Sequence, residues 1–305
     1  MARRKASFIW FRAGLFMLIL CCAALTVSAY SPYAAEGPSI IAHRGASGYA
    51  PENTMAAFEL AERLGADFIE LDIRMSKDGE LVVIHDKTVD RTTNEAGYVH
   101  DYTLQELQGM DAGSHFHADY ADETIVSLEE VMDRFAGRIG ILIEIKDPPL
   151  YPGIEEKLAE MVRRYEIIQD ILGIGVSESI QGKEYIEDPG GRAGSEGIAS
   201  SEGTAGIIIQ SFDFNSMRRI HSLLPGIPAA VLIHADRHPL TDKTLDELAS
   251  FASYINVSHD LLDGELVREI LERNRKVMAW TIRNDQDMDR MKKLGVDGII
   301  TDYPG

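Results

Sequence analysis

Residues 68–85 read FIELDIRMSKDGELVVIH. Within them an apolar run, Phe68–Ile73, is followed seven residues later by a second run, Leu81–Ile84. The Asp78-Gly79 pair between the runs is typical of the tight turn of a β-hairpin. Because so short a connection has no room for a crossover helix, we predict that the second run pairs antiparallel with the first.

Similar apolar runs recur along the chain and alternate with amphipathic stretches. They are Ser39–Ala42, Ile141–Ile145, Ile207–Gln210, Ala229–Ile233, Tyr254–Val257, Val277–Thr281 and Gly298–Thr301. Several are unbroken Val, Ile and Leu, as in strands that are buried on both faces of a parallel sheet. This alternation is typical of an α/β barrel or of an open doubly wound sheet.

The number of runs favours the barrel. Without the antiparallel return, eight of the nine runs remain as parallel strands, the number that a TIM-type barrel needs. We therefore predict an α/β fold over residues 38–305, a (β/α)8 TIM-type barrel with a hairpin return after the second strand.

Helix signals fall between the runs. Thr54–Leu64 and Asp285–Leu294 are each followed by a glycine, which often ends a helix. Capping boxes at Thr103–Glu106, Ser127–Glu130 and Thr244–Glu247 predict three helix starts.

Two stretches break the alternation. Residues 88–124 are long and polar, and we predict a small inserted cap subdomain there. Residues 177–205 are dominated by Gly, Ser and Glu. Because that composition cannot bury a core, we predict a flexible surface loop.

Residues 1–29 have the layout of an export signal. Four basic residues precede an uncharged apolar run at 13–27, and Val27-Ser28-Ala29 offers a cleavage site. The run is nearly long enough to span a bilayer, so an uncleaved membrane anchor is the alternative. Either way we expect an exported protein, whether extracellular, periplasmic or attached to the cell surface. Both cysteines, Cys21 and Cys22, lie in this segment, so the rest of the chain needs no disulfide.

The charge balance bears on partners. There are 49 acidic and 30 basic side chains, for a formal net charge of −19. No basic stripe is visible, so we predict no nucleic-acid partner. An anionic substrate would have to be neutralised locally, by a metal or by a few placed cations. The sequence leaves the oligomeric state open.

Polar residues follow or end the predicted strands, where TIM-type barrels carry their active sites. They are His43, Arg44, Glu70, Asp72, His85, Asp86, Glu144, Lys146, Gln210, Ser211, Trp280, Thr281, Thr301 and Asp302. Residues i and i+2 of a strand share a face, so Glu70 and Asp72 project together. Glu144 and Lys146 do the same on the next parallel strand.

Three carboxylates that converge on one mouth would repel one another, and a divalent cation relieves that repulsion. Oxygen ligands suit Ca²⁺ or Mg²⁺ better than zinc. We therefore predict that Glu70, Asp72 and Glu144 bind one such ion. For Glu144 the alternative is a structural ion pair with Lys146.

Two histidines are expected beside this ion. Counted back from the hairpin turn, Ile73 faces Ile84, which places His85 opposite Asp72. His43 approaches from the end of the first strand. Histidines that move protons next to a bound metal are typical of phosphoryl transfer.

Arg44 and Lys146 complete the set as cations for phosphate oxygens. Trp280 either contacts substrate or fills the barrel. The remaining histidines show no convergent pattern and are expected in loops or at the surface. They are His115, His117, His221, His234, His238 and His259.

Taken in order, these motifs resemble those of the glycerophosphodiester phosphodiesterase family, over nearly everything after residue 38. The resemblance rests on HRGASGYAPENT at 43–54, ELD at 70–72, DG at 78–79, VIHD at 83–86, RTT at 91–93, DAGS at 111–114, SLEE at 127–130, EIK at 144–146, QSF at 210–212, AWT at 279–281 and TDYP at 301–304.

The resemblance implies a barrel with an inserted cap and a Ca²⁺ or Mg²⁺ ion on the three carboxylates. It implies His43 as general base, His85 as general acid, Arg44 and Lys146 as phosphate ligands, and Glu52 and Asp86 in support. A substrate hydroxyl would attack phosphorus, and water would open the cyclic phosphate to give glycerol 3-phosphate and an alcohol.

Two alternatives stay open. The same chemistry could serve a lysophospholipid or a glycerophosphate polymer of the cell envelope. A non-catalytic phosphate-ligand binder is the other, although a binder has no need of two proton-transfer groups.

Overall fold

The computed structural model describes residues 37–172, 206–234 and 240–305. The predicted leader at 1–29 and the predicted loop at 177–205 lie outside the described residues. Pro38–Gly305 form one compact unit. Within the described ranges, no helix combines the length and the apolar character needed to cross a bilayer.

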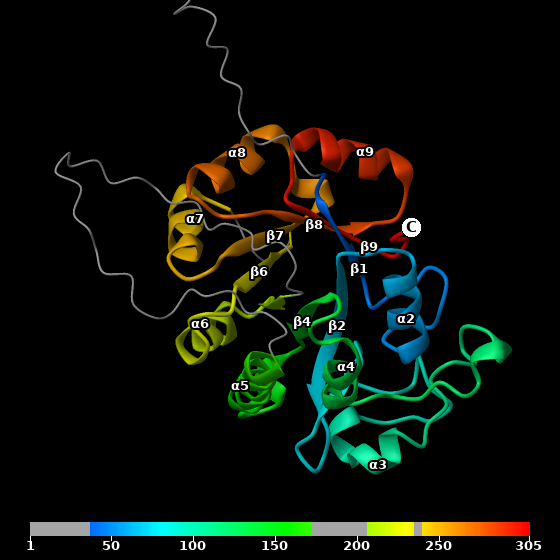
Figure 1. The fold of residues 1–305 in the computed structure, drawn as a ribbon. Helices are drawn as coiled ribbons and strands as arrows, with labels where there is room; N and C mark the ends of the chain where they lie inside the picture. Colours follow the sequence, from blue (N-terminus) through cyan, green and yellow to red (C-terminus); the bar gives the residue numbers. More distant parts are fainter. Residues whose placement is uncertain (1–36, 173–205, 235–239) are drawn as a thin grey trace, which may run out of the picture. The chain divides into compact units, whose positions relative to one another are not determined.

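The strands close into a barrel. They are β1 Ser39–Ala42, β2 Phe68–Met75, β3 Leu81–Val83, β4 Gly140–Ile145, β5 Ile207–Ser211, β6 Ala229–Ile233, β7 Tyr254–Ser258, β8 Met278–Ile282 and β9 Gly298–Thr301. Their order in the sheet is β1-β9-β8-β7-β6-β5-β4-β2-β3, and β1 also pairs with β2. All pairs are parallel except β2 with β3, and the helices lie outside (Figure 1). The predicted (β/α)8 barrel with its hairpin return is confirmed.

The hairpin register differs from the prediction by one residue. Ile73 pairs with Val83 rather than with Ile84. The paired strands end at Met75 and Leu81, and the N–H of Ser76 still donates to the Glu80 carbonyl at 2.9 Å, which leaves three residues in the turn. The prediction assumed a two-residue turn centred on Asp-Gly, and the longer turn shifts every pair by one position.

The shift changes how His85 reaches the mouth of the barrel. The N–H of Ile84 donates to the Asp72 carbonyl at 2.9 Å, so Ile84 and not His85 lies opposite Asp72. β3 ends at Val83. His85 therefore stands on the loop after the strand, where its side chain is no longer bound to the strict alternation of the ladder.

Eight α-helices are described: α2 Met55–Arg63, α3 Leu104–Leu107, α4 Leu128–Phe135, α5 Ile154–Leu172, α6 Phe214–Leu223, α7 Asp242–Ala249, α8 Gly264–Glu272 and α9 Asp285–Leu294. The capping boxes at Thr103 and Ser127 are confirmed. The predicted helix start at Thr244 is wrong, because Thr241 caps α7 by accepting a hydrogen bond from the Thr244 N–H at 3.2 Å. Thr244 is thus inside the first turn.

Successive side chains of a strand point to opposite faces of the barrel wall, so the apolar residues form two separate clusters. The larger cluster lies between strands and helices and includes Leu71 and Ile73. The other fills the barrel and consists of Ile41, Leu142, Ile208, Ala230, Met278 and Ile300. Glu144 follows Leu142 by two residues, and Glu70 follows the inward Phe68 in the same way. The inward carboxylates therefore sit above an apolar floor, at the carboxyl ends of the strands.

Residues 88–124 run between β3 and α4 (Figure 1). They hold α3 and the 3₁₀ turns Val99–Asp101 and Ala118–Tyr120. A separate cluster packs beneath them, made of Val82, Ile84, Val89, Val99, Leu107, Met110, Ala112 and Ile125. The segment thus has apolar packing of its own.

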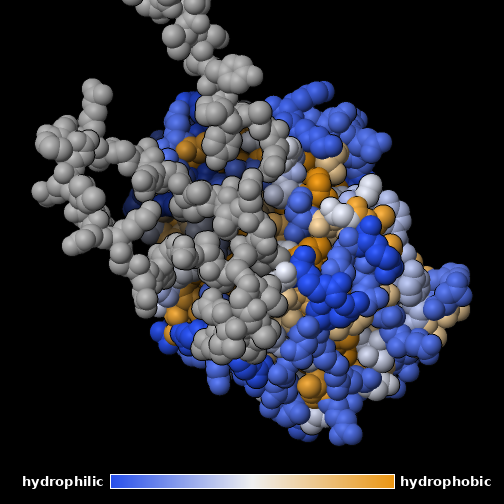
Figure 2. All heavy atoms as spheres, in the orientation of Figure 1, coloured by the Kyte–Doolittle hydropathy of each residue, from blue (hydrophilic) through white to orange (hydrophobic). Residues whose placement is uncertain are grey.

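The face shown in Figure 2 is mainly hydrophilic where residues are described, with apolar atoms in small separated areas. Such a surface is expected for a chain in which 26% of the residues are charged.

Candidate active site

Three buried carboxylates meet at the mouth of the barrel. Glu70 and Asp72 come from β2 and Glu144 from the adjacent β4, where Asp72 and Glu144 are register partners. One oxygen of each carboxylate lies within 4.8 Å of the other two. The residues are 1%, 1% and 6% exposed. The convergence expected from the i, i+2 spacing is therefore present.

The donor set fits a divalent cation. Asp72 Oδ1 is buried and has no hydrogen-bond partner, although buried polar atoms are nearly always satisfied. Its nearest cation is Lys146 Nζ, at 3.5 Å. Carboxylate oxygens are the ligands that Ca²⁺ and Mg²⁺ prefer, so an ion held by Glu70, Asp72 and Glu144 would satisfy the orphaned oxygen.

Burial makes this acidic cluster unfavourable without such an ion. Burial raises the pKa of Glu70 well above its usual value, and the charges of Asp72 and Glu144 raise it further. Burial also raises the pKa of Glu144, against the opposing effect of Lys146. Burial would raise the pKa of Asp72 too, but Lys146 and Arg44 hold it well below its usual value.

The raised pKa values predict how metal removal affects stability. A carboxyl whose pKa is raised by folding contributes stability that is lost as pH rises through the folded value. Chelated protein should therefore lose stability as pH rises above the usual carboxyl range, because Glu70 and Glu144 must then ionise in the folded protein. Added Ca²⁺ should raise Tm more near pH 8 than near pH 5, measured by thermal unfolding with and without EDTA. An equal shift at both pH values would contradict the account.

The turn after β1 brings backbone groups to the carboxylates. The N–H of Arg44 donates to Glu70 Oε2 at 2.8 Å, with Arg44 in the left-handed region at φ 57°. Gly45 follows at φ +78°, where a Cβ would lie 2.6 Å from the Ala57 carbonyl carbon. Only glycine fits that position, which explains the glycine after His43 and Arg44.

Side-chain amides hold two of the carboxylates from other sides. Asn53 Nδ2 donates to Asp72 Oδ2 at 2.9 Å. Gln210, from β5, donates to Glu70 Oε1 at 3.3 Å, and Asn256 Nδ2 donates in turn to Gln210 Oε1 at 3.0 Å. These contacts fix the carboxylates before any ion binds.

Two cations stand over the cluster. Lys146 Nζ lies 2.6 Å from Glu144 Oε1, so the ion pair that the sequence left open is present. Arg44 Nε lies 3.3 Å from Asp72 Oδ2, and Arg44 Nη1 donates to Glu52 Oε1 at 2.8 Å. Both cation side chains are partly exposed at the mouth, 13% for Lys146 and 18% for Arg44. They can therefore meet the oxygens of a phosphate.

His43 is held by a carboxylate. Its Nδ1 lies 2.6 Å from Asp302 Oδ1, and Arg283 Nε donates to Asp302 Oδ2 at 2.5 Å. Burial lowers the pKa of His43 below 6.5, partly offset by Asp302. Burial would raise the pKa of Asp302, but His43 and Arg283 lower it to about 2. A neutral His43 with Nδ1 bound leaves Nε2 as the proton acceptor.

Asp302→Asn tests this pair. Because the charge of Asp302 raises the pKa of His43, its removal should lower that pKa further. The acidic limb of the pH profile of kcat/KM should move to lower pH. The maximal value of kcat/KM should fall by about 10–100-fold, as it does when other supporting contacts are lost. An unchanged limb would show that His43 does not set it.

His85 has the same kind of support. Its Nδ1 lies 2.7 Å from Asp86 Oδ1, and burial lowers the pKa of His85, against the effect of Asp72. The hydrogen bond from Arg91 lowers the pKa of Asp86 to about 2, assisted by His85. In both histidines an ionised aspartate therefore holds Nδ1, which leaves Nε2 for proton transfer.

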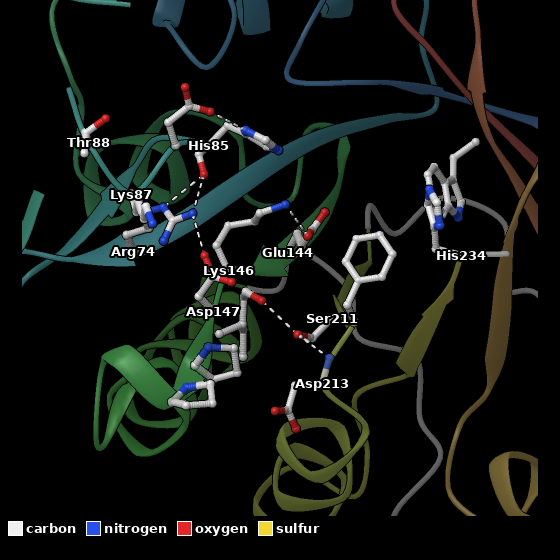
Figure 3. Close-up of a pocket in the computed structure, with 16 residues that line it drawn as sticks. Arg74, His85, Lys87, Thr88, Glu144, Lys146, Asp147, Ser211, Asp213 and His234 are labelled. Carbon is white, nitrogen blue, oxygen red and sulfur yellow. Dashed lines mark hydrogen bonds and ion pairs between the residues drawn. The ribbon is translucent and has the colours of Figure 1, made fainter. Parts of the chain in front are cut away.

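Two cavities meet at the site. One of about 350 Å³ is lined by His43, Arg44, Glu70 and their neighbours. The other, of about 710 Å³, extends past Arg74, Lys87 and Asp213 (Figure 3). Both are lined by His85, Glu144, Lys146, Phe212 and Trp280. His85 and Lys146 therefore stand where the two cavities join.

Trp280 lies at this junction. Its Nε1 donates to the Asn256 carbonyl at 3.1 Å, and its ring meets Phe212 edge-on at 5.5 Å. His234, which follows β6, lines the larger cavity, and His259, which follows β7, lines the smaller one. No sequence pattern marked these two histidines. His238 lies outside the described residues.

Asp302 is the clearest site residue to which the sequence reasoning gave no role. It follows β9, and barrel closure pairs β9 with β1, so that Ala42 and Thr301 are partners. His43 and Asp302, which directly follow these partners, therefore lie side by side at the ends of two adjacent strands. The signal was available in the predicted barrel, since the last strand must lie beside the first.

The family comparison agrees with this geometry. Residues 43–305 match the model of the glycerophosphoryl diester phosphodiesterase family. The chain belongs to this family. The chain is therefore an enzyme, a phosphoric diester hydrolase.

Individual relatives and solved structures support the same family assignment. A Bacillus subtilis relative is 40% identical over 265 residues, which cover 87% of this chain and 94% of the relative's length. Another B. subtilis protein, named glycerophosphodiester phosphodiesterase, is 36% identical over 87% of this chain and 83% of its own. The structure of an Oleispira antarctica phosphodiesterase in complex with the product sn-glycerol-3-phosphate has a TM-score of 0.66 at 26% identity, covering 88% of this chain and 94% of that one.

Proposed function

We propose that this phosphodiesterase hydrolyses glycerophosphodiesters to glycerol 3-phosphate and an alcohol, with a Ca²⁺ or Mg²⁺ ion as cofactor. The observation that carries the proposal is the convergence of three buried carboxylates between two histidines, each fixed by an aspartate. The product complex of the O. antarctica relative supports the choice of substrate.

The proposed roles follow from the contacts. Glu70, Asp72 and Glu144 would hold the ion, which supplies positive charge to the phosphate oxygens. Arg44 and Lys146 bind those oxygens from the rim of the mouth, where both are partly exposed. Glu52 and Asp86 act in support, by holding Arg44 and His85.

Each of the two steps of the reaction uses two proton transfers. His43 starts as the neutral imidazole and His85 as the imidazolium, with Asp86 on its Nδ1. His43 Nε2 takes the proton of a glycerol hydroxyl as its oxygen bonds to phosphorus, and His85 gives its Nε2 proton to the leaving alcohol as the bond from that alcohol to phosphorus breaks. Water then opens the cyclic phosphate, with a proton taken by His85 and a proton returned by His43. Both histidines thereby regain their starting states.

The direct test is product formation from glycerophosphocholine with Ca²⁺, Mg²⁺ or EDTA. We expect sn-glycerol 3-phosphate and choline with a metal and none in EDTA. Full turnover after confirmed metal removal would contradict the metal role. Choline release from lysophosphatidylcholine at an equal rate would favour the lysophospholipid alternative, and release of glycerol phosphate from an envelope polymer would favour the other.

We also propose that the protein is exported, with residues 1–29 either removed or kept as an anchor. The basic start, the apolar run and the small-residue site support this. The amino-terminal sequence of the protein purified from fractionated cells tests it. A cytoplasmic protein that retains Met1 would contradict export.

A further inference from the structure

Arg91, in the segment 88–124, binds two carboxylates at the mouth of the barrel. Its Nη1 and Nη2 donate to the two oxygens of Glu52, each at 2.8 Å. Its Nε donates to Asp86 Oδ2 at 2.7 Å and its Nη2 to Asp86 Oδ1 at 3.2 Å. A planar guanidinium can serve two carboxylates in this way, whereas a lysine ammonium cannot.

Each of these carboxylates has its second partner in the site. Asp86 Oδ1 lies 2.7 Å from His85 Nδ1, and Glu52 Oε1 accepts from Arg44 Nη1 at 2.8 Å. Charge-assisted hydrogen bonds therefore run without a break from His85 to Arg44. The two ends come from different loops, after β3 and after β1, and Arg91 is the link between them.

Resting on the proposed function, we infer that Arg91 is a positioning residue that orients His85 toward the leaving alcohol and holds Arg44 at the phosphate. It acts through Asp86 and Glu52 and touches no reacting atom itself.

The need for such a residue is greater at His85 than at His43. The His85 side chain is 31% exposed and that of His43 is 12% exposed, so packing constrains His85 less. Without Arg91, the carboxylates of Asp86 and Glu52 would lose their shared cation and could turn to water. The His85 ring would then lose its fixed orientation.

The competing explanation is an ordinary surface ion pair, which contributes little. Arg138 offers a matched control for it. Its side chain is 48% exposed, against 47% for Arg91. It also binds a glutamate through two nitrogens, with Nε to Glu62 Oε1 at 3.0 Å and Nη2 to Glu62 Oε2 at 2.9 Å. Arg138 precedes β4, at the opposite end of the strands from the site.

Leaving-group chemistry separates the two explanations. Choline leaves as an alkoxide that needs a proton from His85 as the bond to phosphorus breaks. Nitrophenol is acidic enough to leave as the anion. Misorientation of His85 should therefore slow glycerophosphocholine hydrolysis more than hydrolysis of the nitrophenyl ester of glycerol 3-phosphate, whereas a general loss of folded protein slows both equally.

The experiment measures kcat/KM for release of choline or nitrophenol, which reports the first, cyclising step, in wild type, Arg91→Gln, Arg91→Lys and Arg138→Gln, with saturating Ca²⁺. For Arg91→Gln we expect a fall of about 10–100-fold with the choline ester, as for other supporting contacts. The fall with the nitrophenyl ester should be clearly smaller, because that ester loses the hold on Arg44 but does not need the proton of His85. Arg91→Lys should resemble Arg91→Gln, and Arg138→Gln should resemble wild type.

Rescue guards against misfolding. Guanidinium added to Arg91→Ala should restore the choline-ester rate preferentially, and ammonium at the same concentration should not. Equal losses on both esters, a variant that behaves like Arg138→Gln, or no guanidinium rescue would each overturn the inference. A wild-type protein that turns over neither ester would instead overturn the proposed function itself.

Discussion

The His85→Ala variant should hydrolyse glycerophosphocholine about 10²–10⁴-fold more slowly than wild type, the range that general acid–base groups contribute. Asp86 holds Nδ1 of His85, which leaves Nε2 free to protonate the leaving alcohol. His43→Ala should fall by a similar factor, because Asp302 holds that ring in the same way. Release of sn-glycerol 3-phosphate measures both.

Three controls accompany this prediction. His221→Ala makes the same change on α6 and should keep wild-type activity. Both site variants should keep the Ca²⁺-dependent rise in Tm, since neither histidine is a proposed ligand. The double variant should lose much less than the product of the two single losses, because the groups act as a unit. Retention of more than about a tenth of the activity in either single variant would refute its role in proton transfer.

Glu70→Gln should separate metal binding from folding. In the metal-free protein near pH 8, an ionised Glu70 is unfavourable because burial and neighbouring carboxylates raise its pKa. A neutral glutamine of the same shape removes that cost, so Tm in EDTA should rise above the wild-type value. The Ca²⁺-induced shift in Tm should disappear, and activity should fall by more than about 100-fold, beyond the cost of a supporting contact.

The pH dependence sharpens this result. Near pH 5 the difference in Tm between Glu70→Gln and wild type in EDTA should shrink, because protonation makes Glu70 neutral as well. Glu265→Gln, on the exposed first turn of α8, is the matched control and should change none of these quantities. A Glu70→Gln protein that still shows the full Ca²⁺ shift would mean that Glu70 is not a ligand.

The barrel and its carboxylates could be predicted because they depend on local patterns. Two buried runs joined by a short turn must pair antiparallel, and Glu70 and Asp72 must share a face wherever the strand lies. The hairpin register could not be predicted from the Asp-Gly pair, because the turn has three residues and not two. The helix start predicted from the capping box at Thr244 was wrong because a second suitable cap, Thr241, lies three residues earlier.

The supporting residues were harder to predict because they depend on contacts between distant segments. Asp302 meets His43 only once β9 closes against β1. Arg91 meets Glu52 across 39 positions of sequence, through a segment without regular alternation. Asn256 reaches Glu70 only through Gln210. Such contacts follow from the closed barrel and leave no periodic signal along the chain.

The most direct test of the metal site is anomalous scattering from crystals of the protein soaked in Mn²⁺, a stand-in for Mg²⁺ that can be located by its own signal. We expect one ion bonded to an oxygen from each of Glu70, Asp72 and Glu144, and no ion there in Glu70→Gln crystals. An anomalous peak elsewhere, or an empty carboxylate cluster in crystals of active enzyme, would contradict the account.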